Sequence, residues 1–248
     1  MTLSLLAANA ALFLDIDGTL LEFKDDAETV RAPEALRGTL DSLRQSLGGA
    51  LAVVSGRALP SVDRVFAPLR LAAAGDHGAE ARFGAAGAVR TFASPPELAA
   101  LSAVLAEVRS RLDVSSAVNP EKKAFSLAFH YRGAEAEELL LREIVRATVA
   151  SHDALLTLAE GELCFDVFLK SQNKGKAIER FIAAPPFRGR VPVYVGDSGT
   201  DEEGFAAVLG AGGRAIRVGK PKATRATETL ASPAELRDWL ARSAKVLA

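Results

Sequence analysis

The stretch 11-ALFLDIDGTLLEF-23 places two carboxylates one residue apart at the end of an apolar run. The run is typical of a buried β-strand, in which side chains two residues apart point the same way. Asp15 and Asp17 are therefore expected to face one spot beyond the carboxyl end of this strand, where open α/β sheets bind ligands. Gly18 permits a sharp turn there, although Asp-Gly is also ordinary turn chemistry.

Short apolar runs alternate with helical patterns at both ends of the chain. Continuous apolar strands separated by helices predict a parallel sheet covered on both faces, the α/β class with a Rossmann-like core. The predicted strands are 11–15, 50–54, 71–74, 191–195 and 214–218. The predicted helices are 33–47, 58–67, 174–183, 201–209 and 233–246.

The middle of the chain has a different order of predicted elements: a helix, strands, a second helix and further strands. This order predicts a separate α+β unit inserted into the α/β core. We expect a catalytic core over 1–93 plus 169–248, and an inserted domain over 94–168.

The composition limits the partners and the compartment. The 248 residues carry a formal net charge of -1, which predicts neither a nucleic-acid partner nor attraction to an acidic membrane. Cys164 is the only cysteine, so an internal disulfide and a cysteine-held zinc site are both excluded. The chain shows no basic leader, no run long enough to span a bilayer and no heptad pattern, so a cytoplasmic monomer is expected.

Two other motifs supply groups that suit an anion. In 52-AVVSGR-57 a strand ends in Ser55, Gly56 and Arg57, and hydroxyl and backbone N–H groups can hold phosphate oxygens. Lys174 stands at the start of a helix, with Asn173 as the expected N-cap. A cation at that end opposes the helix dipole, which favours an anion nearby.

The segment 191-VPVYVGDSGTDEEGF-205 adds further carboxylates at a strand end. Thr200 with Glu203 fits a capping box, and acids are favoured at a helix start. Capping leaves Asp197, at the strand end itself, unexplained.

Together these groups predict phosphoryl transfer. Carboxylates without histidine or cysteine are the ligands that Mg²⁺ prefers. A carboxylate can attack phosphorus to give an aspartyl-phosphate, while a second one protonates the leaving oxygen and later activates water. The pair at 15 and 17 would divide these two tasks at one phosphate.

This chain carries DIDGT at 15–19, Ser55, Lys174 and GDSGTD at 196–201, in this order. As a set, these motifs resemble those of the haloacid dehalogenase-like (HAD) phosphatases. The resemblance implies Asp15 as nucleophile and Asp17 as acid/base, with Ser55 and Lys174 completing the catalytic set. It also implies Mg²⁺ held by Asp15, the backbone carbonyl of Asp17 and Asp197, with Asp201 in support. The insert is similar to the larger α+β cap of that superfamily, the C2B type.

Finer features resemble the trehalose-6-phosphate phosphatases within that superfamily. They are SGR at 55–57, GDHGAE at 75–80, EKKAFSLAFHYR at 121–132 and NKG at 173–175. The resemblance implies a sugar phosphate as substrate, whose hydroxyls charged side chains can bind with directional selectivity. The expected substrate contacts are Gly18, Thr19, Gly56, Arg57, His77, Glu121, Lys123, His130, Arg132 and Asp166.

The chain departs from the family pattern at two places. Ser198 stands where the family usually has a second acid, and Asp166 lies near the position of a family glutamate, without the proline that usually follows. His77 is equally well read as a loop histidine held by backbone contacts.

Three alternatives stay open at this point. One is a phosphatase for sucrose phosphate, mannosyl phosphoglycerate or another sugar phosphate. Another is a signalling receiver domain, which also groups aspartates, a hydroxyl residue and a lysine around Mg²⁺, although Asp17 and the long insert argue against it. The third is a binding protein that has lost turnover.

Overall fold

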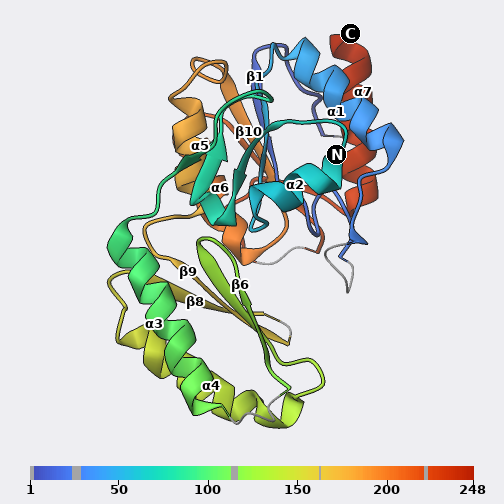
Figure 1. The fold of residues 1–248 in the computed structure, drawn as a ribbon. Helices are drawn as coiled ribbons and strands as arrows, with labels where there is room; N and C mark the ends of the chain where they lie inside the picture. The colour runs from blue at the N-terminus through green and yellow to red at the C-terminus, as the bar shows by residue number, and fades with distance from the viewer. Residues whose placement is uncertain (1–2, 24–28, 113–116, 162, 221–222) are drawn as a thin grey trace. The chain divides into compact units, whose positions relative to one another are not determined.

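The computed structural model of the chain describes residues 3–23, 29–112, 117–161, 163–220 and 223–248. The chain divides into two compact units, each built on its own β-sheet (Figure 1). We call them the core unit, Met1–Arg90 with Asn173–Ala248, and the inserted unit, Thr91–Gln172. The insert that the sequence predicts, 94–168, falls inside the second unit.

The sheet of the core unit has eight strands in the order β12-β11-β10-β1-β2-β3-β4-β5. The strands from β12 to β3 are parallel to their neighbours, and β4 runs antiparallel to β3. The strands are β1 (Ala10–Leu14), β2 (Leu51–Val54), β3 (Ala72–Gly75), β4 (Glu80–Arg82), β5 (Arg90–Thr91), β10 (Val191–Gly196), β11 (Arg214–Val218) and β12 (Glu228–Leu230). The predicted α/β class with a parallel-sheet core is confirmed.

Helices cover both faces of this sheet. In Figure 1, α1 packs beside α7 and α5 beside α6, with the strands between the two pairs. The sequence dictates which side of a helix is buried, as in α1, where Leu36, Leu40 and Leu43 face inward at helical spacing. The helices are α1 (Glu34–Ser46), α2 (Leu59–Phe66), α5 (Lys174–Ile182), α6 (Glu202–Gly210) and α7 (Pro233–Leu247).

An aromatic cluster fixes the centre of the core unit. The ring of Phe13 on β1 lies 5.8 Å from that of Phe181 on α5 and 5.4 Å from that of Phe187. All three side chains are fully buried. Burial of a phenylalanine side chain contributes about 1.5–3 kcal/mol, so this cluster strongly couples α5 to the strand that leads to Asp15.

The inserted unit is a four-stranded antiparallel sheet with two helices. The strand order is β6-β7-β9-β8, and along β7 and β9 the residues Leu127, Phe129, Phe165 and Val167 form a buried apolar face. Helices α3 and α4 contact these strands, so the opposite face carries the polar residues. The elements are α3 (Pro95–Arg111), β6 (Asn119–Lys122), β7 (Ser126–His130), α4 (Glu138–Ala150), β8 (Leu156–Gly161) and β9 (Cys164–Leu169).

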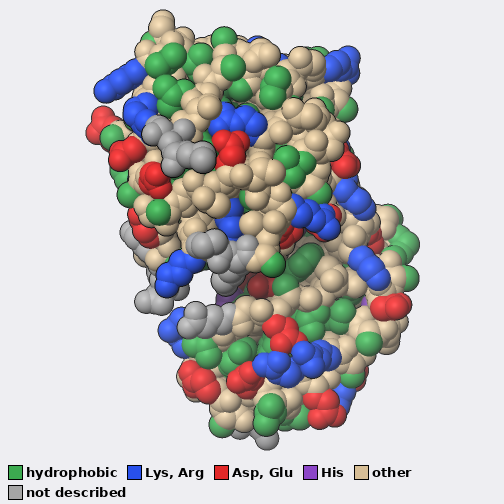
Figure 2. Space-filling view, turned by 180° about the vertical axis from the view of Figure 1, so that it is seen from behind, with side chains coloured by type: hydrophobic (Ala, Val, Ile, Leu, Met, Phe, Trp, Pro, Cys, Tyr) green, Lys and Arg blue, Asp and Glu red, His purple; other side chains and the backbone are tan. Residues whose placement is uncertain are grey.

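The surface matches the balanced composition. Lys and Arg side chains are interspersed with Asp and Glu side chains on the face drawn in Figure 2. Within the described residues, no helix combines the length and the apolar character needed to cross a bilayer.

Candidate active site

The site is assembled by neighbouring strands that end together. Leu14 of β1 is paired with Val195 of β10 and with Val53 of β2, all in parallel register. The residues that follow these strands therefore meet at the carboxyl edge of the sheet, where α/β folds bind ligands. These residues are Asp15, Ser55 and Asp197.

A tight turn after β1 brings Asp15 and Asp197 together. Gly18 has φ +78°, and its N–H donates to the carbonyl of Leu21 at 2.8 Å. A Cβ at Gly18 would lie 2.3 Å from Oδ2 of Asp197, so only glycine fits. The buried Thr19 hydroxyl lies 3.1 Å from Oδ2 of Asp15 and 2.9 Å from Oδ1 of Asp197. Thr19 therefore joins the two carboxylates.

Lys174 is buried at the first position of α5. The predicted N-cap is confirmed, because the Asn173 side chain accepts a hydrogen bond from the N–H of Lys176 at 2.8 Å. Nζ of Lys174 donates to Oδ1 of Asp15 at 2.8 Å and to Oδ1 of Asp201 at 2.7 Å. Burial alone would lower the pKa of Lys174, but these two carboxylates raise it well above its usual range. The lysine therefore stays charged between two acids.

The carboxylate of Asp201 is saturated by donors. Its Oδ1 accepts from Lys174 and from the hydroxyl of Tyr194, which the sequence did not indicate as a site residue. Its Oδ2 accepts from the N–H groups of Asp197 at 3.1 Å and Ser198 at 2.8 Å, and from the Ser198 hydroxyl at 2.7 Å. Burial favours a high pKa for Asp201, but Lys174 and these hydrogen bonds hold its pKa below the usual value. Asp201 thus positions its neighbours.

The predicted capping box lies elsewhere. Instead of Thr200 with Glu203, Ser198 and Asp201 form the reciprocal box, ahead of the short turn that leads into α6. The prediction was wrong because the chain makes a separate turn over Gly199–Asp201 before the α-helix begins at Glu202. Ser198, the departure from the family pattern, thus contributes a donor to Asp201.

Three carboxylates and one ammonium leave the site rich in negative charge. Oxygens of Asp15, Asp197 and Asp201 lie within 4.8 Å of one another. Burial, together with the charges of Asp201 and Asp197, raises the pKa of Asp15 to about 8 despite Lys174. Burial and Asp201 also raise the pKa of Asp197. The hard oxygen ligands of Asp15 and Asp197 therefore fit a divalent cation, whereas the oxygens of Asp201 already accept several hydrogen bonds.

The Ser55-Gly56-Arg57 motif follows β2 as predicted. Ser55 is buried, and its Oγ accepts from the N–H of Arg57 at 3.1 Å. The guanidinium of Arg57 pairs with the Asp17 carboxylate through Nε at 2.6 Å and Nη2 at 2.7 Å. The side chain of Asp17 thus points toward Arg57 and lies outside the carboxylate cluster.

His77 lies against this motif on a strained turn. Asp76 has φ +45° and His77 has φ +56°, backbone angles that residues other than glycine rarely adopt. The N–H of His77 donates to the carbonyl of Ser55 at 3.1 Å, and that of Asp76 to the carbonyl of Arg57 at 3.0 Å. A Cβ at Gly56 would meet the His77 ring at 2.7 Å. The GDHGAE segment therefore braces the end of β2.

A second group of predicted residues lies in the inserted unit. Glu121 on β6 is paired in register with Ala128 on β7, which is paired with Asp166 on β9. Two carboxylates thus flank a small residue on the polar face of the sheet. Nε2 of His130 lies 3.2 Å from the Glu121 carboxylate and lowers the pKa of Glu121.

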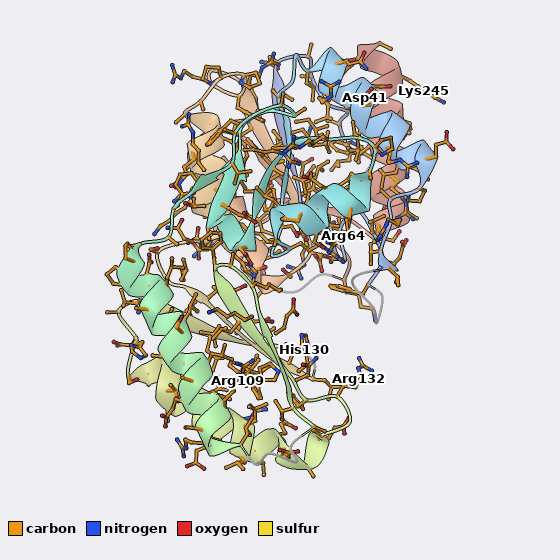
Figure 3. The ribbon with its side chains drawn as sticks, viewed as in Figure 1. Asp41, Arg64, Arg109, His130, Arg132 and Lys245 are labelled. Carbon is orange, nitrogen blue, oxygen red and sulfur yellow. The ribbon has the colours of Figure 1, made fainter. Side chains whose placement is uncertain are left out.

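The remaining polar residues surround this face. Burial raises the pKa of Asp166, while Lys123 and His130 oppose that rise. Lys123 lies in the turn between β6 and β7, and its N–H donates to the carbonyl of Ser126 at 3.0 Å. Figure 3 shows His130 at the end of β7 and Arg132 in the turn that follows.

Comparison with known proteins decides the family. The trehalose-phosphatase family model matches residues 13–234. The chain belongs to the trehalose-phosphatase family. It is 36% identical over 234 residues to a probable trehalose-phosphate phosphatase of Sinorhizobium fredii, covering 94% of this chain and 87% of the relative. It is 33% identical over 239 residues to the trehalose-6-phosphate phosphatase of Escherichia coli, covering 95% and 86%.

Solved structures of this family share the fold. The C-terminal domain of Candida albicans trehalose-6-phosphate phosphatase superposes with a TM-score of 0.79 at 20% identity, over 95% of this chain and 92% of that one. A phosphatase of the haloalkanoate (HAD) enzyme superfamily from Bacteroides thetaiotaomicron superposes with a TM-score of 0.61 at 21% identity, over 94% of each chain. The predicted HAD fold is therefore confirmed.

Proposed function

We propose that this chain hydrolyses trehalose 6-phosphate to trehalose and phosphate, with the core unit catalytic and the inserted unit acting as a C2B-like cap. The observation that carries the proposal is the family match over residues 13–234, which includes the buried Asp15 between Thr19 and Lys174. The relatives from Sinorhizobium fredii and Escherichia coli are named for the same activity.

In the first half-reaction, an oxygen of the Asp15 carboxylate attacks the phosphorus. A bond forms between Asp15 and phosphorus, the bond from phosphorus to the sugar oxygen breaks, and Asp17 gives a proton to that oxygen. Trehalose leaves, and the phosphoryl group stays on Asp15.

In the second half-reaction, Asp17 takes a proton from a water molecule as that water attacks the phosphorus. The bond between Asp15 and phosphorus breaks, which releases inorganic phosphate and restores the carboxylate. One group therefore serves as acid and then as base, as microscopic reversibility allows.

Other residues hold charge in place during both steps. Lys174 offsets the carboxylate of Asp15 and the phosphoryl oxygens, and Asp201 keeps the lysine in position. The Ser55 hydroxyl and the backbone at Gly56 offer donors to the phosphoryl group. Mg²⁺ held by Asp15, the backbone carbonyl of Asp17 and Asp197 would supply further positive charge when bound.

The inserted unit would select the sugar. Glu121, Lys123, His130 and Asp166 gather on the polar face of its sheet and offer charged partners to hydroxyl groups. A hydroxyl-binding site discriminates strongly against ligands that leave its polar groups unpaired. Arg132 lies beside this set.

The test is phosphate release, with and without Mg²⁺, from trehalose 6-phosphate, sucrose 6-phosphate, mannosyl phosphoglycerate and 4-nitrophenyl phosphate. We expect a strong preference for trehalose 6-phosphate that is lost when a chelator removes the metal. Equal use of all sugar phosphates would refute the named substrate and retain the phosphatase. Absence of release from every compound would refute the hydrolase.

A further inference from the structure

Arg57 forms a two-point ion pair with the Asp17 carboxylate. Nε and Nη2 of Arg57 contact Oδ2 and Oδ1 of Asp17, at 2.6 and 2.7 Å. The Arg57 side chain is 10% exposed and that of Asp17 is 27% exposed. Such two-point pairs between guanidinium and carboxylate are directional and roughly twice as strong as neutral hydrogen bonds.

The end of β2 holds Arg57 in this position. Its N–H donates to Oγ of Ser55 at 3.1 Å, and its carbonyl accepts from the N–H of Asp76 at 3.0 Å. Nη1 lies 3.4 Å from the hydroxyl of Ser61 on α2. The pair with Asp17 is therefore built by the strand end and by the helix that follows.

This geometry conflicts with the proposed work of Asp17. An acid/base must place a carboxylate oxygen within about 2.6–3.2 Å of the atom that gains or loses the proton. Arg57 engages both oxygens of Asp17. The pair holds this carboxylate turned toward Arg57 and outside the cluster of Asp15, Asp197 and Asp201. Turning it toward a leaving oxygen at Asp15 therefore opens at least one of these hydrogen bonds, and another group must then satisfy the guanidinium.

We infer that Arg57 is a positioning residue that determines specificity, an inference that rests on the proposed function. In the substrate-free enzyme Arg57 holds Asp17 away from the reaction. Hydroxyl groups of a polyhydroxylated substrate then take over the guanidinium and release Asp17. A phosphate ester without such hydroxyls leaves the pair closed and reacts slowly.

The test compares two substrates in Arg57 variants. In Arg57→Ala, kcat/KM for trehalose 6-phosphate should fall about tenfold or more, because the substrate loses a charged partner. The kcat for 4-nitrophenyl phosphate should instead rise, on the order of threefold, because Asp17 is released. Arg57→Lys, which cannot form the two-point pair, should show the same rise to a smaller extent.

Two comparisons separate this role from a purely structural one. Arg64→Ala changes an exposed arginine of α2, the helix that follows Arg57, and should alter the kinetics of neither substrate (Figure 3). The rise with 4-nitrophenyl phosphate should be absent when Arg57→Ala is made in an Asp17→Asn background, because the effect passes through Asp17.

If the Arg57 variants lower kcat/KM for trehalose 6-phosphate and kcat for 4-nitrophenyl phosphate alike, the inference is overturned. If Arg57→Ala does not fold, Arg57→Lys decides by the same criterion. If the wild type hydrolyses 4-nitrophenyl phosphate and no sugar phosphate, the proposed function fails. The aryl substrate alone then decides: a higher kcat in the variants supports the hold on Asp17, and an equal or lower kcat refutes it.

Discussion

The acidic residues of the site differ in their hydrogen-bond partners, and these partners separate their roles. Asp201 is surrounded by donors, Asp17 is paired with an arginine, and Asp15 faces a lysine and a threonine. Burial is the main cause that raises the pKa of Asp15 to about 8. A nearby cation would relieve that charge.

The hydroxyl of the buried Tyr194 donates a hydrogen bond to Asp201. Tyr194→Phe removes the hydroxyl that donates to Asp201 and leaves the buried ring in place. Since Asp201 also holds Lys174, we predict that kcat falls about threefold to tenfold while KM changes little. Tyr131→Phe, at the chain's other tyrosine, is the matched control. Steady-state kinetics with an unchanged kcat for Tyr194→Phe would contradict the role.

Among the elements, the turn at 76–78 lies against the start of α5. Gly78 has φ +99°, and a Cβ there would lie 2.8 Å from the carbonyl oxygen of Asn173. Gly38 lies inside α1 with nothing within 4 Å of its Cβ position. The same substitution should therefore act in opposite directions at these two glycines.

We predict that Gly78→Ala lowers both the unfolding temperature and kcat, because the start of α5, which carries Lys174, must shift. Gly38→Ala should stabilise the protein by about 0.5–1 kcal/mol, because alanine loses less backbone entropy in a helix. Thermal unfolding and steady-state kinetics of both variants test this. Equal stability of the two variants would show that the turn at 76–78 is not constrained as described.

Long amphipathic helices and apolar strands were predictable, because each repeats its burial pattern over many residues. Helix α1 and strand β1 lie within two residues of their predicted positions. Strand β6 reads NPEK and carries no apolar alternation, so only its partner β7 identifies it as a strand. Tyr194 also escaped prediction, because in an apolar strand its hydroxyl gives no sign of its partner across the turn.

Within the site, the sequence predicted which strand ends carry chemistry, because register brings them together in any parallel sheet. It could not predict that Arg57 pairs with Asp17, since 40 positions separate them and both orientations suit a phosphate site. The roles of the predicted residues in the inserted unit stay predictions.

For the whole molecule, a cation in the carboxylate cluster should link stability to metal and pH. We predict that Mg²⁺ raises the unfolding temperature of the wild type and that Asp197→Asn removes most of the rise. Because the pKa of Asp15 is raised to about 8, ion binding must displace a proton at neutral pH, so the rise should grow as pH increases toward 8. Asp238→Asn, an exposed change in α7, is the control. If Mg²⁺ raises the unfolding temperature of Asp197→Asn as much as that of the wild type, a cation site at this cluster is contradicted.

The inserted unit gives a second prediction at this scale. Glu121→Ala should lower kcat/KM for trehalose 6-phosphate more than for 4-nitrophenyl phosphate, by about tenfold in the ratio, because it removes a partner of sugar hydroxyls. Glu143→Ala, an exposed position on α4, serves as control. Equal losses on the two substrates would remove Glu121 from the specificity set.

Asp15 is proposed to carry the phosphoryl group between the two half-reactions, and an acid quench can trap it there. The enzyme is mixed with trehalose 6-phosphate and Mg²⁺, quenched in acid within milliseconds and analysed by peptide mass spectrometry. We predict one added phosphoryl group on the peptide that contains Asp15 and none in Asp15→Asn. With 4-nitrophenyl phosphate, whose leaving group needs no proton, Asp17→Asn should hold more of this phosphoryl group, because water is no longer activated. Sustained phosphate release by purified, folded Asp15→Asn, or a phosphoryl group on another residue, would contradict the account.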